Sequence, residues 1–187
     1  MGGCDKTTPA LLMGALSADV PSIFMPGGPM NKTSWRGDQL GSGSDVWKYW
    51  AERGAGRLGC EEWCQLEDHI AASPGHCMTM GTASTMTSIA EAMGMSLPGS
   101  ASVPATHSSH SRVASSAGRQ AVELAWYNVK PSEIMTADAF HNGITALMSI
   151  LMIIAGFLFS AVAGYMAGLV GSSNNPISGV TIATILT

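Results

Sequence analysis

The sequence predicts an α/β domain followed by one C-terminal transmembrane helix, and three observations support this fold class. Short apolar runs typical of strands alternate with helical patterns over residues 1–143, as expected of an α/β protein. Formal charge then stops, because Asp138 is the last Asp, Glu, Lys or Arg in the chain. Finally, 46% of the 187 residues are hydrophobic, which is enough for a core and too many for simple disorder.

The charge balance and the cysteine content exclude two classes of protein. Nine Lys and Arg against 13 Asp and Glu give a net charge of −4, so there is no basic surface for nucleic acid. Four cysteines are too few for a disulfide scaffold. We therefore interpret them as thiols with a chemical role.

Capping and turn residues indicate the first elements. Thr7 or Thr8 can cap a helix whose first position is Pro9, where a missing N–H has no cost. The apolar run 20–25 predicts a buried strand that ends at PGGP, residues 26–29. Residues 37–44 are rich in Gly and Ser and predict a loop.

Apolar residues at helical spacing predict four further helices. The predicted helices cover residues 46–54, 61–73, 81–94 and 111–129. The second of them is amphipathic through Trp63, Leu66 and Ile70. A short strand is predicted at residues 101–104, between the last two helices.

Two cysteines stand directly before predicted helices. Cys4 opens CDKTTP (residues 4–9), and Cys77 lies in GHCMTMGTASTM (residues 75–86). A helix N-terminus carries unpaired N–H groups and partial positive charge, which stabilise a thiolate, the form that binds iron or zinc. The pair is therefore a candidate metal site, and two buried structural cysteines are the alternative.

These segments resemble the dihydroxy-acid/phosphogluconate dehydratase family, with the features of its sugar-acid branch. The resemblance covers residues 1 to about 144. The matching motifs, in chain order, are GCDKTTPA (3–10), PGGPM (26–30), the Cys77 segment, LPG (97–99), PA (104–105) and Thr136, Ala139, Phe140 and Asn142.

The resemblance implies an enzyme that removes water from 2,3-dihydroxy acids or sugar acids to give 2-keto acids. It implies an iron–sulfur cluster, 2Fe-2S or 4Fe-4S, with Cys4 and Cys77 as two of its three cysteine ligands. It also implies that Asp5 and a carbamylated Lys6 bind Mg²⁺. Such cations stabilise the charge that develops on a departing hydroxyl, and oxygen ligands suit Mg²⁺.

The family's site extends beyond this sequence. Its third cluster cysteine and one acidic metal ligand lie upstream of the matching segment, while a serine base and another acidic ligand belong to a C-terminal half. Cys60 and Cys64 match no ligand position and are interpreted as packing or surface residues. We therefore expect an incomplete domain, a fragment that is inactive alone.

Three residues are candidate substrate contacts: His107, His110 and Arg112. Their side chains can meet the hydroxyls and carboxylate of a sugar acid, because Arg binds carboxylates through two hydrogen bonds. A solvated loop that leads into a helix is the alternative. His76, beside Cys77, is interpreted as an exposed loop residue rather than a donor to the metal site.

Residues 144–187 form the second predicted domain. Residues 144–170 are uncharged, apolar and longer than the roughly 20 residues that a bilayer core requires, so they predict a transmembrane helix. Small residues recur every four positions, at Gly156, Ser160, Gly164 and Gly168. This spacing predicts packing against a helix partner or a second copy of the chain. A buried helix of a soluble protein is the alternative.

The segment 168–184, with its core SSNNPISG, resembles part of the oligopeptide transporter family. The alternative function is therefore a membrane-anchored fragment of a transporter-like protein with a vestigial soluble part. Two incomplete signatures in one chain indicate a fusion or a mis-joined reading frame near residue 143. We expect a membrane location if the helix inserts and a cytoplasmic location otherwise.

Overall fold

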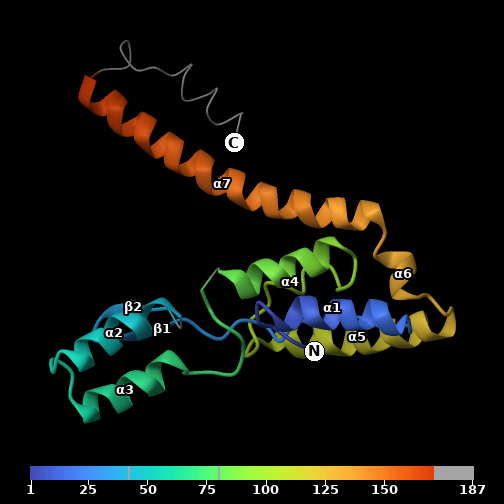
Figure 1. The fold of residues 1–187 in the computed structure, drawn as a ribbon, viewed down its shortest axis with the longest axis horizontal. Helices are drawn as coiled ribbons and strands as arrows, with labels where there is room; N and C mark the ends of the chain where they lie inside the picture. Colours follow the sequence, from blue (N-terminus) through green and yellow to red (C-terminus); the bar gives the residue numbers. More distant parts are fainter. Residues whose placement is uncertain (42, 80, 171–187) are drawn as a thin grey trace. The chain divides into compact units, whose positions relative to one another are not determined.

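The computed structural model describes residues 1–41, 43–79 and 81–170. Two compact units are present, Met1–Gly143 and Ile144–Thr187. The described residues are mostly helical, and their strands form one small antiparallel hairpin (Figure 1). In chain order the elements are α1 (Thr7–Ala18), β1 (Thr33–Trp35), β2 (Asp38–Leu40), α2 (Ser44–Gly54), α3 (Cys60–Ile70), α4 (Thr82–Ala92), α5 (Ser108–Trp126), α6 (Pro131–Ile134) and α7 (Ala137–Val170).

The first predicted helix is confirmed as α1, although its start differs. Lys6 occupies the cap position without a side-chain cap, so Thr7 and Thr8 lie inside the first turn. Pro9 also lies in the first turn, where an N–H has no helical acceptor. The helix ends at Ala18, and the cap residue that follows, Asp19, has a left-handed backbone with a φ of 48°.

The strand predicted over residues 20–25 is wrong, and the parallel pairing expected of an α/β fold is correspondingly small. The chain from this segment onward pairs through two isolated parallel bridges, Gly2 with Pro26 and Pro29 with His76. These bridges use the carbonyl oxygens of Met25 and Gly28 and the N–H groups of Gly27 and Met30, so the pairing begins only at the end of the predicted strand. In the part that the structure describes, helices therefore outweigh strands.

A β-hairpin occupies the beginning of the loop predicted over residues 37–44. Strands β1 and β2 pair with Trp35 opposite Asp38. The turn residues between them, Arg36 and Gly37, have φ angles of 53° and 89°, as a two-residue type I′ turn requires. Asn-Gly is the stronger signal for this turn, so the Arg-Gly pair did not reveal the second strand.

Helices α2 and α3 confirm the helices predicted over residues 46–54 and 61–73. Helix α3 ends at Ile70 with Ala71 as its C-cap, earlier than predicted. Strand β1 packs against α3, and Figure 1 shows the hairpin with α2 and α3. The core that these elements share contains Trp35, Leu40, Tyr49, Leu58 and Leu66.

A second core lies between α1, α4 and the start of α7. Helices α4 and α5 confirm the helices predicted over residues 81–94 and 111–129. The strand predicted over residues 101–104 is wrong, because the Glu91 carboxylate accepts the N–H groups of Gly99 and Ala101 and holds a turn there. The buried members of this core are Leu12, Phe24, Ala90, Met93, Met95, Met135 and Ala139.

Helix α7 contains the predicted apolar span. The stretch Ala137–Val162 is the one described segment that is long and apolar enough to cross a membrane, by length and composition. Side chains such as Ile153 and Phe157 are exposed, and none of the apolar window is buried inside the protein. The segment 168–184 lies almost entirely outside the described residues. The packing of the apolar span of α7 against a partner helix stays a prediction.

Candidate functional site

Three parts of the chain that are far apart in sequence meet on one extended segment, residues 25–30. The N-terminal residues, the loop before α4 and the loop before α5 each form backbone hydrogen bonds with it. These bonds run from Gly2 N to Met25 O (3.2 Å), Gly27 N to Gly2 O (2.8 Å), His76 N to Gly28 O (2.8 Å), Met30 N to His76 O (2.9 Å) and Ala105 N to Pro29 O (3.0 Å).

Two glycines in the motifs allow this close approach. Gly28 has a φ of 77°, and a Cβ there would lie 2.6 Å from the Val103 carbonyl oxygen. Gly75 has a φ of 128°, and a Cβ there would lie 2.5 Å from the Met30 nitrogen. Because both clashes are with backbone atoms, a side chain at either position would push the loops apart.

The two candidate ligand cysteines follow residues that are in contact. Gly3, directly before Cys4, lies against the ring of His76, directly before Cys77: a Cβ on Gly3 would be 2.5 Å from the imidazole Cδ2. Cys4 is exposed and Cys77 is half-buried. The fold thus brings the two motif segments together, while the role of the two thiols as cluster ligands stays a prediction.

The predicted magnesium ligands Asp5 and Lys6 contact each other. The Asp5 carboxylate accepts hydrogen bonds from the Cys4 thiol at 3.1 Å and from Lys6 Nζ at 3.1 Å. These two bonds, that from Cys4 first, lower the pKa of Asp5, and the bond to Asp5 raises the pKa of Lys6. A carbamylated Lys6 would no longer carry the ammonium that pairs with Asp5, so this ion pair would have to open.

No group of three or more His, Cys, Asp or Glu side chains that could hold a metal ion occurs within residues 1–41, 43–79 and 81–170. The contact between the motif segments therefore does not by itself create a full set of ligands.

The candidate substrate residues divide into two groups. His107 caps α5, since its Nδ1 accepts the Ser109 N–H at 3.1 Å, and Arg112 donates to the Ser109 hydroxyl at 2.7 Å. His110 instead donates from Nε2 to the carbonyl oxygen of Pro26 at 3.2 Å, which joins α5 to the PGGP turn. His110 therefore lies at the meeting point of the loops, and substrate contact by these residues stays a prediction.

The structure corrects the interpretation of His76 and adds Thr8. His76 is half-buried, and its Nε2 is buried without a hydrogen-bond partner. Thr8, in the first turn of α1, has no exposed surface, and its hydroxyl likewise lacks a partner. Their positions near Cys77 and Cys4 were the only signal in the sequence for these two residues. The burial of their side-chain atoms depends on the loop contacts and could not be predicted.

Cys60 and Cys64 are both exposed on α3, as the surface interpretation predicted. Arg53 Nη2 lies 4.0 Å from the Cys60 sulfur.

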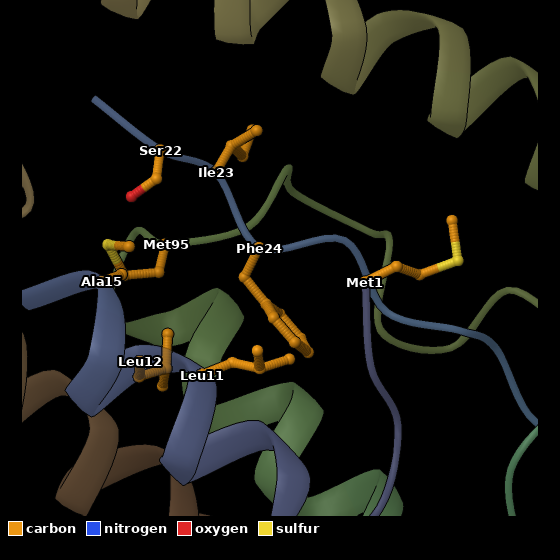
Figure 2. A pocket seen from close by; sticks show the side chains of 8 residues that line it. All are labelled: Met1, Leu11, Leu12, Ala15, Ser22, Ile23, Phe24 and Met95. Carbon is orange, nitrogen blue, oxygen red and sulfur yellow. The ribbon is translucent and has the colours of Figure 1, made fainter. Parts of the chain in front are cut away.

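A cavity of about 190 Å³ lies between α1 and residues 22–24 (Figure 2). Its lining is apolar except for Ser22, whose hydroxyl is buried without a partner. None of the predicted site residues borders it. A sugar acid requires a cationic or donor-rich site for its carboxylate, so the lining of this cavity does not fit such a substrate. The lining residues are Met1, Leu11, Leu12, Ala15, Ser22, Ile23, Phe24 and Met95.

Comparison of the sequence with known protein families shows which family the chain belongs to. Residues 1–151 match the family described as dihydroxy-acid/6-phosphogluconate dehydratase, N-terminal. The chain belongs to this family. The match confirms the dehydratase resemblance and extends it past residue 144 into α7, whereas the transporter resemblance of the C-terminus stays a prediction.

Curated relatives are sugar-acid and dihydroxy-acid dehydratases. The chain is 48% identical over 149 residues to 6-deoxy-6-sulfo-D-gluconate dehydratase of Pseudomonas putida, covering 80% of this chain and 26% of that protein. It is 49% identical over 142 residues to L-arabinonate dehydratase of Rhizobium leguminosarum bv. trifolii, covering 76% of this chain and 24% of that protein. It is 38% identical over 149 residues to dihydroxy-acid dehydratase of Metallosphaera sedula, covering 80% of this chain and 27% of that protein. The chain thus spans about a quarter of the length of these relatives.

Proposed function

We propose that this chain is part of a hydro-lyase that dehydrates sugar acids or 2,3-dihydroxy acids to 2-keto acids. The observation that carries the proposal is the contact between Gly3 and His76, because it joins the Cys4 and Cys77 motifs at adjacent residues. Membership of the dehydratase family and the names of the relatives support the same reaction. The greater similarity to the first two relatives favours a sugar acid.

The donor atoms fit the metals that the family resemblance implies. Cys4 and Cys77 offer sulfur ligands, which suit an iron–sulfur cluster, and Asp5 and a carbamylated Lys6 offer oxygen ligands, which suit Mg²⁺. Buried unpartnered groups on His76 and Thr8 lie in the same two motifs, as expected where a bound group completes the hydrogen bonding. When bound, the metals would supply Lewis-acid stabilisation of the leaving hydroxyl.

The other site residues would bind and orient the substrate. Arg112 and His107 lie at the start of α5, where a carboxylate can meet the guanidinium and the free N–H groups of the helix. His110 fixes that helix start to the PGGP turn. We propose that the chain has two parts. Residues 1–143 form a partial iron–sulfur dehydratase domain, and residues 144–187 contain a membrane-spanning segment. We also propose that the chain alone is inactive, because the family resemblance assigns further ligands to parts of the family outside the matching segment.

Anaerobic reconstitution of the full chain with ferrous iron, sulfide and Mg²⁺ tests this proposal. We expect a brown, oxygen-sensitive protein that loses its colour on Cys4→Ser or Cys77→Ser. Cys60→Ser is the matched control, because it removes an exposed thiol of α3 and leaves the motif cysteines intact. A colourless chain, or equal loss of colour in the control, would contradict the proposal.

A second candidate function rests on α7. No residue of the most apolar window within Ala137–Val162 is buried inside the protein, which favours a lipid environment or a helix partner for that window. On this hypothesis the chain is a membrane-anchored, transporter-like fragment whose N-terminal unit is vestigial. Colour on reconstitution separates the two functions, since a vestigial site would bind no cluster.

A further inference from the structure

His76 lies between the two cysteine motifs and is fixed on three sides. Its backbone N–H donates to Gly28 and its carbonyl accepts from Met30, at 2.8 and 2.9 Å. Its ring lies on the backbone of Gly3, with no room for a side chain there. The position of the ring therefore determines how closely the segment that carries Cys4 can approach the loop that carries Cys77.

The two ring nitrogens of His76 have different environments. Nδ1 lies 3.0 Å from the carbonyl oxygen of Cys77, and a carbonyl oxygen only accepts, so Nδ1 carries the hydrogen. In the neutral ring, Nε2 then presents a lone pair, and this atom is buried with no partner. Histidines that face a bound group show the same arrangement, in which a backbone carbonyl orients one nitrogen and leaves the other for the ligand.

We propose that His76 is a positioning residue of this site. Its ring sets the separation of the Cys4 and Cys77 thiols, and its Nε2 accepts a hydrogen bond from an O–H group, a water or a substrate hydroxyl, held at the metal site between the two motifs. The ring's role stands on the geometry alone, whereas the identity of the bound group rests on the proposed function.

Cross-linking of the full chain tests the role of the ring without any metal. In a Cys60→Ser/Cys64→Ser background, a short bismaleimide should join Cys4 to Cys77, and His76→Ala should slow this reaction about tenfold or more, because intramolecular rates fall steeply with misplacement. His76→Phe keeps a ring and should keep the cross-link. His69→Ala, on α3, is the matched control. An unlinked parent chain, or His76→Ala that reacts as fast as the parent, would overturn the proposal.

Gly3→Ala tests the same contact from the other side, and remains informative if His76→Ala does not fold. The added methyl group meets the His76 ring and should slow cross-linking, whereas Gly14→Ala, with no atom within 4 Å of the new Cβ, should not. The Gly3→Ala/His76→Ala double variant should react no slower than the worse single variant, because one contact is removed twice. If the two changes slow cross-linking additively, the contact between Gly3 and His76 is not the cause of the slower reaction.

The role of Nε2 is tested by two replacements in the reconstituted chain. His76→Asn retains a donor near the position of Nδ1 and lacks Nε2, while His76→Gln places an acceptor near Nε2. We expect faster loss of bound iron in the Asn variant, measured by visible absorbance, and rescue by Gln. Equal retention by Asn and the parent would overturn the role of Nε2. A parent that binds no iron would refute the proposed function, while cross-linking would still decide the role of the ring.

Discussion

Single glycine positions control how the loops of the candidate site meet. Gly75 directly precedes His76, and a Cβ there would lie 2.5 Å from Met30 N and 2.7 Å from the carbonyl carbon of Pro29. No rotamer change relieves a clash with backbone, and a φ of 128° is strained for any residue with a side chain. The glycine is therefore required for the loop that carries His76 and Cys77.

Gly75→Ala should destabilise the chain by about 1–3 kcal/mol through backbone strain, with the steric clash adding to this loss. Urea unfolding followed by circular dichroism measures the change. Gly14→Ala is the matched control, since it lies inside α1 with open space around the new Cβ and should stabilise the helix by about 0.5–1 kcal/mol. Equal stability of the Gly75→Ala variant and the parent would show that the loop has another conformation.

Between elements, a polar joint links the end of α1 to the start of α6. The Asp19 carboxylate accepts the Ser132 N–H at 3.2 Å and lies 3.7 Å from Lys130 Nζ. The hydrogen bond from Ser132, and then the charge of Lys130, lower the pKa of Asp19 below its usual value of 3.8. Asp19 thus favours the folded state most strongly when it is ionised.

The sign of the pH dependence follows from this lowered pKa. The stabilisation by Asp19 is complete above its unfolded pKa of about 3.9 and is lost as the pH falls through the lower, folded pKa. Asp19→Asn should therefore reduce stability at neutral pH and lessen the dependence of stability on pH below about 4. Asn also tolerates the left-handed backbone at this position, so the change isolates the charge. Thermal unfolding between pH 2 and 7 measures both effects. If the stability of the variant and that of the parent fall equally with pH below about 4, Asp19 is not the group responsible.

For the whole molecule, the main question is what covers the apolar surface of α7. Exposed side chains along it include Ile153, Phe157 and Leu158. Exposed aromatic residues also occur in the first unit, where Trp126 is 83% exposed. Exposed apolar surface of this kind is typical of a region that contacts a partner protein or a membrane.

If α7 inserts in a bilayer, the full chain should remain in the membrane pellet after alkaline carbonate extraction. An arginine near the centre of a span costs about 2.5–3.5 kcal/mol, so Ile153→Arg/Leu158→Arg should move the chain to the soluble fraction. Val122→Arg, at an exposed position of α5, is the matched control and should stay with the parent. Release of the parent chain by carbonate would refute insertion.

Much of the helical structure was predictable because helices depend on local spacing and end signals. The helices around Leu66 and Ala117, and the apolar run in α7, follow from residues within a few turns of one another. The strand predicted over residues 20–25 was wrong because an extended apolar run becomes a strand only if a neighbour supplies a ladder. Here no such neighbour lies beside residues 20–25 among the described residues, and the pairing that follows consists of the single bridges at Pro26 and Pro29.

The sequence by itself determined the family, the candidate thiols Cys4 and Cys77, and the change from a charged to an uncharged chain, since these are properties of residue type and order. Only the tertiary structure decided that Gly3 meets His76, that His110 reaches Pro26 and that His76 Nε2 is buried without a partner. These contacts join residues many positions apart, and their geometry depends on loop closure and backbone clearance, which no local pattern specifies.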